Sequence, residues 1–231
     1  MLSVSLEKIL EKNKMSLIVS IPRNDPALAY AAMRAGADAI KMHVNVEHWA
    51  SGNSFASTEA YVESFRDIRE QFSGPLGVVP GGSFEAIKAN ELKKLTELGF
   101  NYFSIYAHHM PTWMLELNKY EKTFAITSDY SIESLGNIHD LGITAMEASI
   151  IQANEYGSPL TFKDILAYRY IVQNTDVPVM IPSQRLLLPS DVAPLHTAGV
   201  NAVMLGAVVI GQTEESIERA VASFKNELDK L

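Results

Sequence analysis

The chain has 231 residues, of which 47% are hydrophobic and 20% are charged, a composition that predicts a well-filled core rather than a disordered chain. Nineteen Lys and Arg residues against 27 Asp and Glu give a formal charge of −8, which argues against a broad surface for nucleic acid or an anionic membrane. There is no cysteine, so disulfides, thiolate metal sites and cysteine nucleophiles are excluded. The length suits one or two domains, and single α/β barrels reach the same size.

The first residues predict a helix rather than a signal peptide, because charges interrupt any apolar run and Leu6, Ile9 and Leu10 share one helical face. The longest apolar stretch, residues 200–211, contains Asn201 and two glycines. It falls well short of the roughly 20 residues that span a membrane. We therefore expect a cytoplasmic protein with no membrane partner.

Eight short apolar segments alternate with amphipathic segments from one end of the chain to the other. The apolar segments predict strands at residues 16–21, 37–44, 75–80, 101–107, 123–128, 144–151, 177–182 and 202–206. The segments between them carry helix-start signals. These signals are Asp25 and Pro26 before residues 27–35, Ser57 before 58–72, Thr161 before 165–173, Asp191 before a helix weakened by Pro194, and Thr213 before a closing helix through Leu228.

A partial repeat precedes the second, fourth, sixth and eighth predicted strands. In each copy a helix ends at a glycine that is free to adopt the left-handed conformation: Gly36, Gly99, Gly142 and Gly199. Four such βαβα quarters close most naturally as a (β/α)₈ TIM barrel, with an open doubly wound α/β sheet as the competitor. No linker divides the chain, so we predict a single domain over residues 1–231 with an extra N-terminal helix.

In such a barrel the active site lies at the carboxyl ends of the strands, where alternate side chains point inward. The apolar residues of the second strand suit the helix side, which sends Lys41 and His43 into the barrel mouth. A lysine there needs a partner or a depressed pKa. It suits a Schiff-base amine, a general acid or base, or a cation beside a substrate oxyanion. The structural alternative is a lysine satisfied by a barrel carboxylate.

The same alternation turns Glu147 of the sixth strand inward, where it is the obvious counter-charge for Lys41. Because these two strands face each other across the barrel, direct contact is left open. On the fourth strand the alternation sends His108 inward as a proton carrier, and His109 is expected to face the loop. No cofactor is predicted, but a divalent metal held by His43, His108 and Glu147 is kept as an alternative, although no spacing matches a recognised metal motif.

Residues 45–56 form a long polar segment with a central glycine, which is typical of a lid over a site. In the lid interpretation Trp49 or Phe55 closes over a ligand, and in the structural interpretation it packs on a neighbouring helix. Further loop residues are candidates for the rim, weighed against ordinary solvation: Arg23, Asn45, His48 and Asp129.

Residues 198–207, Ala-Gly-Val-Asn-Ala-Val-Met-Leu-Gly-Ala, resemble the pattern A-G-A-x-A-V-x-V-G-S/T that enters the phosphate site of the ribulose-phosphate-binding barrel superfamily. Residues 37–42 resemble the motif G-A-D-x-I-K of the same superfamily. The superfamily includes phosphosugar epimerases, isomerases, aldolase-like enzymes and decarboxylases. The resemblance implies a phosphate at Gly206 and Ala207, where backbone N–H groups and a helix N-terminus favour an anion.

Two departures from the superfamily bear on the activity. Where a glycine pair usually follows the seventh strand, this chain has Ser183, Gln184 and Arg185. The Ser183 hydroxyl and a bidentate Arg185 would then contact the phosphate in place of backbone groups. The chain also lacks the Asp-x-Lys-x-x-Asp set of the decarboxylases and the paired His and Asp metal ligands of the pentulose-phosphate epimerases, so the resemblance selects no particular activity.

The sequence favours an enzyme that acts on a small phosphorylated metabolite, either an isomerase or epimerase or an aldolase-type carbon–carbon lyase. Lys41 and Glu147 are its expected acid and base, with His43 or His108 as a proton carrier. The alternatives are metal-assisted chemistry and a non-catalytic ligand-binding barrel. Barrels of this class often form homo-oligomers, and no residue pattern here sets a number of subunits.

Overall fold

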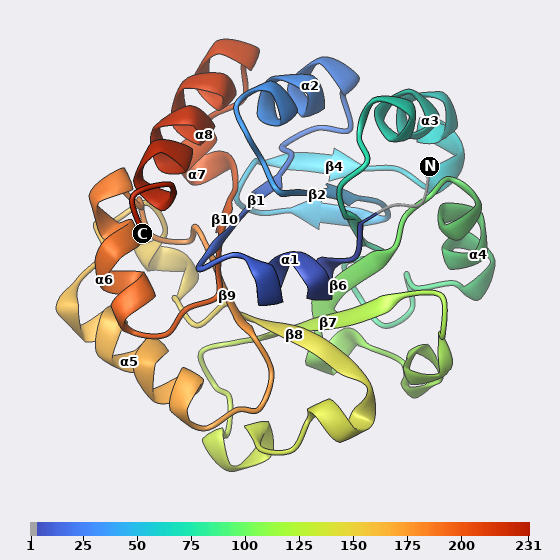
Figure 1. The fold of residues 1–231 in the computed structure, drawn as a ribbon. Coiled ribbons are helices and arrows are strands. Elements are labelled where there is room, and N and C mark those ends of the chain that lie inside the picture. The colour runs from blue at the N-terminus through green and yellow to red at the C-terminus, as the bar shows by residue number, and fades with distance from the viewer. Residues whose placement is uncertain (1–3) are drawn as a thin grey trace.

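A computed structural model describes residues 4–231, and within them eight parallel strands close into a barrel (Figure 1). The order around the barrel is β1-β10-β9-β8-β7-β6-β5-β2. The strands are β1 (Ser16–Ser20), β2 (Ala39–His43), β5 (Leu76–Val79), β6 (Tyr102–Tyr106), β7 (Glu121–Ile126), β8 (Ile143–Ala148), β9 (Val179–Pro182) and β10 (Ala202–Leu205). The predicted α/β barrel is confirmed. The domain predicted for residues 1–231 includes residues 1–3, which lie outside the described part of the chain.

The closed order decides which strands oppose each other. Three strands separate β2 from β8 in either direction around the barrel, and three separate β6 from β10. Side chains that point inward from β2 therefore meet those from β8, and β6 faces β10 across the mouth.

Helices cover the outside of most of the barrel (Figure 1). They are α2 (Pro26–Arg34), α3 (Val62–Gln71), α4 (Ala89–Glu97), α5 (Phe162–Gln173), α6 (Val192–Thr197), α7 (Ala207–Ile210) and α8 (Glu214–Leu228). The predicted caps of α2, α5 and α8 are confirmed, because Asp25, Thr161 and Thr213 each accept a backbone N–H of the first turn. Ser57 instead precedes a 3₁₀ turn, η1 (Thr58–Tyr61), and its side chain makes no capping bond.

Two of the crossings between strands contain only 3₁₀ turns within the described residues. Between β6 and β7 these are η2 (Ala107–His109) and η3 (Thr112–Glu116), and between β7 and β8 they are η4 (Ile132–Leu135) and η5 (His139–Leu141). Two further 3₁₀ turns are η6 (Ala153–Glu155) and η7 (Pro189–Asp191). Pro111 lies in the crossing from β6 to β7, and Gly136 lies in the crossing from β7 to β8. Neither residue favours a continuous helix.

The four repeated glycines all adopt the left-handed conformation that the sequence pattern predicts. Their φ angles are 98° at Gly36, 87° at Gly99, 74° at Gly142 and 92° at Gly199. Each one ends a helix or a 3₁₀ turn and lets the chain enter the next strand, which explains why the repeat marks every second strand.

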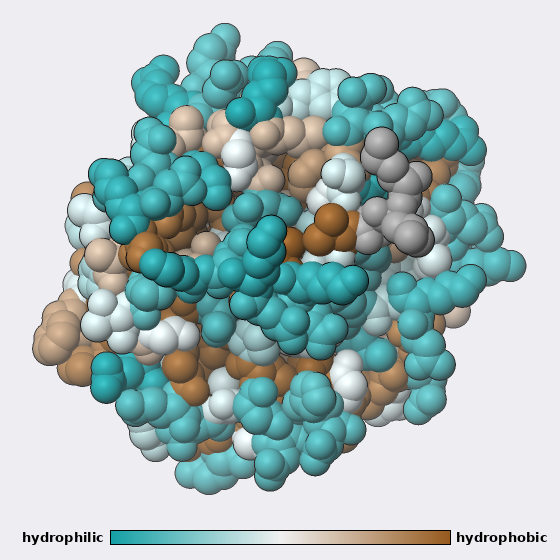
Figure 2. Space-filling view, in the orientation of Figure 1, coloured by the Kyte–Doolittle hydropathy of each residue, from teal (hydrophilic) through white to brown (hydrophobic). Residues whose placement is uncertain are grey.

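The N-terminal helix α1 (Leu6–Lys12) lies across the amino-terminal end of the barrel (Figure 1). Its buried residues Leu6 and Leu10 join Ile18 and Tyr102 in an apolar cluster inside the barrel. The Glu121 carboxylate accepts the N–H groups of Leu6 and Glu7 at 2.7 Å each, which holds the start of the helix. The outer surface of this face is mostly hydrophilic (Figure 2). The helix closes this end, so the inside of the barrel is accessible from the opposite end.

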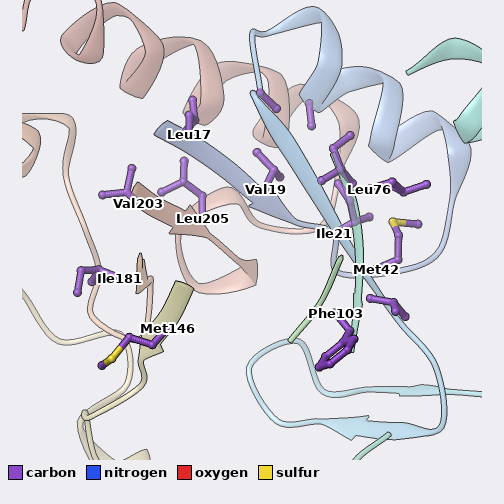
Figure 3. Packing of buried hydrophobic residues seen from close by; sticks show 14 of the residues in the cluster. Leu17, Val19, Ile21, Met42, Leu76, Phe103, Met146, Ile181, Val203 and Leu205 are labelled. Atoms are coloured by element: carbon purple, nitrogen blue, oxygen red, sulfur yellow. The ribbon is translucent and has the colours of Figure 1, made fainter. Parts of the chain in front are cut away.

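A larger apolar core fills the space between the strands and the helices. Alternate strand residues such as Leu17, Val19 and Leu205 lie on the helix side (Figure 3). Ile40 and Met42 of β2 belong to the same cluster, as their expected orientation requires. The remaining strand positions are thereby directed inward.

The predicted lid segment is a hairpin of β3 (Val46–His48) and β4 (Asn53–Phe55). Phe55 is buried, whereas Trp49 in the turn is 75% exposed. The Asn53 side chain donates to Pro22 O at 2.8 Å, and Gln212 donates to Ser51 O at 3.0 Å. The hairpin is therefore tied to the loops that follow β1 and α7. None of the described helices, over residues 4–231, is both long and apolar enough to cross a membrane.

Candidate active site at the barrel mouth

A cavity of about 240 Å³ opens at the carboxyl ends of the strands. Its lining includes six of the twelve residues predicted for the site: Lys41, His43, His48, Glu147, Ser183 and Gly206. The barrel geometry therefore gathers half of the predicted residues around one space. Its position at the open end of the barrel is where enzymes of this fold carry their active sites.

Lys41 and Glu147 meet at the base of this cavity. The Lys41 Nζ lies 2.8 Å from Glu147 Oε1 and 3.0 Å from Oε2, so the ammonium contacts both carboxylate oxygens. The two side chains are 7% and 5% exposed. The contact that the sequence left open is thus present, because each side chain reaches inward from one of two opposing strands. An ion pair this deeply buried costs much of its own Coulomb energy in desolvation, so it is weak evidence for a purely stabilising role.

His43 lies beside the pair and is fully enclosed. Its Nε2 is 3.4 Å from Ser20 Oγ, and its Nδ1 is buried without a hydrogen-bond partner among the described residues. Burial, together with the nearby His48 and Lys41, holds the pKa of His43 well below its usual value. The ring is therefore neutral at pH 7 and presents an uncharged nitrogen beside the ion pair.

His48 of the hairpin packs against His43, with ring centroids 4.4 Å apart and the ring planes tilted by 44°. Its Nδ1 is 2.8 Å from Ser51 Oγ. Burial and the Lys41 charge lower the pKa of His48 to about 4. Phe55 packs against the His43 ring at 4.8 Å. The two aromatic residues of the predicted lid therefore have different positions. Phe55 is buried and anchors the hairpin, whereas Trp49 lines the cavity with most of its surface exposed.

The imidazole at the end of β6 that reaches the cavity is His109 and not His108. The strand ends at Tyr106, and the chain enters the 3₁₀ turn η2 at Ala107, so strand alternation no longer sets the direction of the next side chains. His108 is exposed and stacks on Tyr106 at 5.5 Å. The prediction of an inward His108 is corrected for this reason.

Ser183 and Gly206 form the corner between β9 and β10. The Gly206 N–H donates to Ser183 Oγ at 2.7 Å, and both residues line the cavity. Gly206 is also the N-cap of α7, a short helix that begins at Ala207. Ala207 is half-buried and is not among the lining residues. At the residues predicted to hold a phosphate, a hydroxyl, a backbone amide bonded to it and the start of α7 therefore lie side by side.

Arg185 is directed away from the cavity. Its guanidinium donates to Asp164 Oδ1 at 3.0 Å and to Glu155 Oε2 at 3.3 Å, and it also donates to the Ser158 hydroxyl. These partners lie at the start of α5 and in the loop before it. The structure gives this arginine a connecting role between the β9 loop and α5, because a buried carboxylate there needs a counter-charge.

The other three rim candidates also lie outside the cavity lining. Arg23 is exposed and pairs with Asp25 at 3.8 Å, and Asp129 is exposed and accepts a bond from Thr127. Asn45 has a φ of 52°, and its backbone bonds to Ala56 and Gly82 start the hairpin. Local partners therefore account for Arg23 and Asp129, and Asn45 has a backbone role at the start of the hairpin.

Several polar residues of the cavity were outside the predicted set. Ser104 lines it from an inward position of β6, which strand alternation identifies, and Ser149 lines it one residue beyond the end of β8. Tyr156 comes from the long loop after β8, and its hydroxyl accepts a bond from Gln184 Nε2 at 2.5 Å. No local pattern marks Tyr156, because a loop of this length has no periodicity from which to read a direction.

The metal alternative requires His43, His108 and Glu147 in one group. Within residues 4–231 no three or more His, Asp or Glu side chains are placed to hold a metal ion together. His108 is exposed outside the cavity, whereas His43 and Glu147 line it. The side chains that share the space are an amine, carboxylates, hydroxyls and neutral imidazoles, a set suited to proton transfer.

Solved structures of other proteins share this fold at low identity. Thiamine phosphate pyrophosphorylase from Pyrococcus furiosus has a TM-score of 0.67 and 14% identity, over 94% of this chain and 97% of that one. Tryptophan synthase from Mycobacterium tuberculosis has a TM-score of 0.74 and 11% identity, over 98% of both chains. The tryptophan synthase A-subunit from P. furiosus has a TM-score of 0.68 and 13% identity, over 93% of this chain and 99% of that one. These structures confirm the α/β barrel fold of this chain. No protein-family model matches the chain, and no curated protein matches its sequence.

Proposed function

We propose that this chain is an enzyme that transfers a proton at a carbon beside a carbonyl group of a small phosphorylated substrate, as an isomerase or epimerase does. The observation that carries the proposal is the buried contact of Lys41 with Glu147 at the base of the mouth cavity. The two groups arrive from opposite walls. A substrate placed against this contact would meet the amine and the carboxylate side by side.

The proposed reaction needs only a base and an acid. The Glu147 carboxylate removes the proton beside the carbonyl, and the Lys41 ammonium donates to the enolate oxygen that forms. Glu147 then gives its proton to the neighbouring carbon, and Lys41 takes back a proton from the hydroxyl group on the first carbon, which becomes the new carbonyl; this gives an isomer. For an epimer, a water molecule gives a proton to the opposite face of the first carbon, and the proton on Glu147 passes to solvent. The neutral His43 beside the pair supports the low-polarity surroundings in which such a contact is strong. Lys41 and Glu147 supply the acid and the base of the isomerase scheme.

The corner of Ser183 and Gly206 supports a phosphate in the substrate. A short helix after the eighth barrel strand is a frequent phosphate site in this fold, and α7 occupies that place. One protein that shares the fold, thiamine phosphate pyrophosphorylase, is named for a phosphorylated compound. Because Arg185 is engaged by Asp164 and Glu155, the Ser183 hydroxyl, whose oxygen accepts the Gly206 N–H, would donate its proton to the anion in place of the expected bidentate arginine.

Hydrogen exchange with solvent tests the proton transfer without knowledge of the product. Aldose and ketose phosphates of three to six carbons would be incubated in D₂O with the protein and followed by ¹H NMR. We expect deuterium at the carbon beside the carbonyl of at least one member, and a loss of exchange of at least about 100-fold in Lys41→Met and Glu147→Gln. Lys94→Met, which removes an exposed lysine on α4, is the matched control and should keep full exchange. Absence of exchange with every member would contradict the proposal.

The lysine also fits an aldolase-type lyase that works through a Schiff base, because its amine lines the cavity. Borohydride trapping separates the two reactions. A stable adduct on Lys41, located by peptide mass spectrometry, would select the lyase. Solvent exchange without an adduct would select the isomerase or epimerase.

Gly206→Ala tests the phosphate corner. A Cβ added at Gly206 would lie 3.7 Å from Ser183 Oγ and 4.0 Å from the Ser20 Cβ, which is ordinary contact distance, so the variant should fold normally. The methyl group would occupy space that a phosphate oxygen needs. We expect inorganic phosphate to bind about tenfold more weakly by isothermal titration calorimetry, a loss of about 1.4 kcal/mol. Unchanged affinity would place the phosphate elsewhere.

A further inference from the structure

Ser104 supplies a hydroxyl group to the cavity that the proposed reaction does not use. It points inward from β6 and lines the cavity, and only 2% of the residue surface is exposed. Within residues 4–231 this hydroxyl has no hydrogen-bond partner, whereas the hydroxyl of Thr123, level with it on β7, donates to Phe103 O at 2.9 Å. Buried hydroxyls are normally hydrogen-bonded, because an unpaired one loses its bonds to water without a replacement. Ser104 is therefore available to a group that enters the cavity.

A second donor without a partner follows the neighbouring strand. Gly81 comes two residues after β5, which pairs with β6, and it is buried and lines the cavity. Its N–H donates to no acceptor in the described part of the chain, whereas the N–H of Gly82 donates to Asn45 O at 2.9 Å. Buried backbone N–H groups without a partner are rare in folded proteins. We call the Ser104 hydroxyl and the Gly81 N–H the donor pair.

The donor pair lies across the cavity from the corner of Ser183 and Gly206. In the closed barrel β5 is opposite β9, and β6 is opposite β10. Lys41 and Glu147 come from another pair of opposing strands, β2 and β8, and meet at the base of the same cavity. A molecule that reaches from the corner to the donor pair therefore crosses the cavity in which the ion pair lies.

The charges of the cavity do not suit a second anion at the donor pair. Lys41 is the one lysine or arginine in the described lining, and it is already paired with Glu147. Burial lowers the pKa of the three histidines in the lining, so all three are uncharged at pH 7: His43, His48 and His109. A carboxylate at the donor pair would therefore be buried without a counter-charge, whereas an uncharged carbonyl or amide oxygen accepts the same hydrogen bonds.

We infer that the substrate carries an uncharged carbonyl or amide group at the end remote from its phosphate, and that Ser104 and Gly81 donate to this group. The inference rests on the proposed function, because it takes the phosphate at Ser183 and Gly206 as the other anchor. The reacting carbon then lies between the two ends. Ser104 is thereby a specificity-determining residue, which selects a polar group over an apolar or charged group of the same shape.

Three series of matched phosphonates test this inference, because phosphonates cannot lose the anion by elimination. Two to four methylene groups join the phosphonate to a terminal carboxamide, to a carboxylate, or to an isopropyl group, which have nearly the same shape. Binding to the wild-type protein at pH 7 would be measured by isothermal titration calorimetry. At the best-bound length we expect the carboxamide to bind about five- to tenfold more tightly than the other two, the size of one or two hydrogen bonds.

Variants assign the difference to Ser104. In Ser104→Ala we expect the carboxamide to bind about fivefold more weakly, while the isopropyl phosphonate and inorganic phosphate bind as before. Ser104→Cys keeps nearly the same size with a weaker donor and should lie between Ser104→Ala and the wild type. Ser134→Ala, which removes an exposed hydroxyl outside the cavity lining, is the matched control and should change no affinity. Because the Ser104 hydroxyl bonds to no described residue, Ser104→Ala should keep the thermal unfolding midpoint of the wild type.

The outcomes separate the inference from the proposed function. Equal affinity for the carboxamide and the isopropyl phosphonate would overturn the inference and leave the phosphate corner standing. A carboxylate that binds most tightly would overturn the uncharged group. An equal loss for the carboxamide and the isopropyl phosphonate in Ser104→Ala would give Ser104 a structural role and overturn its contact with the ligand. If neither the phosphonates nor inorganic phosphate bind, the phosphate corner of the proposed function is overturned as well.

Discussion

The ion pair of Lys41 with Glu147 allows a test of whether the barrel interior is built for stability or for chemistry. The perturbation is a double-mutant cycle with Lys41→Met, Glu147→Leu and the double variant, chosen because each replacement has a similar volume and no charge. The two side chains are almost completely buried, and the Nζ lies 2.8 and 3.0 Å from the carboxylate oxygens. Each single variant therefore leaves one buried charge without its partner.

The expected magnitudes follow from this burial. Loss of one partner from a buried ion pair costs about 3–5 kcal/mol, because the remaining charge keeps its desolvation penalty. Such a loss is a large part of the about 5–15 kcal/mol by which typical proteins are stable. Replacement of both partners removes both penalties, so the double variant should be between neutral and about 4 kcal/mol more stable than the wild type. The two single effects are thus strongly non-additive.

Urea denaturation at pH 7, followed by far-UV circular dichroism, measures the four free energies of unfolding. Lys94→Met, which breaks an exposed pair with Glu59, is the control and should change the free energy by no more than about 1 kcal/mol. A double variant that is stable and folded but exchanges no substrate hydrogen would show that the pair serves chemistry. A double variant that loses as much as the two single variants together would refute this reasoning and assign the pair to the fold.

Two further predictions concern the hairpin and the barrel interior. Because burial lowers the pKa of His48 to about 4, its contribution to stability is present above pH 6.5 and is lost as the pH falls toward 4. Urea unfolding should show a drop of at most about 3 kcal/mol over this range that His48→Gln lacks, and equal drops in both proteins would contradict the assignment. Gly77→Ala would place a Cβ 2.0 Å from the buried Tyr102 ring, so we expect a loss of at least about 1–3 kcal/mol, measured by the same method and relieved by Tyr102→Leu. An unchanged unfolding midpoint in Gly77→Ala would show that the ring can move aside.

The barrel could be predicted from the sequence because its signals are local. Short apolar segments predict the strands, and a glycine in the left-handed conformation marks the entry to every second strand, as at Gly36 and Gly199. Strand alternation also identifies the inward side chains of each strand correctly as far as the strand continues, which is how Lys41 and Glu147 were found. These features depend on residues a few positions apart, where backbone geometry alone decides direction.

The site was predictable only as far as alternation reached. Strand β6 ends two residues before His108, so strand alternation does not set the direction of that side chain, and His109 of the 3₁₀ turn lines the cavity instead. In the long loops, Tyr156 has no periodic signal, and Trp49 and Phe55 are alike in sequence but differ in exposure by their places in the hairpin. Backbone direction in such segments is set by contacts with distant parts of the chain.

The sequence by itself determined the eight-stranded α/β barrel, the N-terminal helix and an interior lysine and glutamate on its second and sixth strands. Only the tertiary structure decided that these two charges touch, because their contact depends on the width of the closed barrel rather than on their spacing along the chain. It also assigned Arg185 to Asp164 instead of to a phosphate. A buried charge takes the counter-charge that lies within its reach in space, and that distance exists only once the chain has folded.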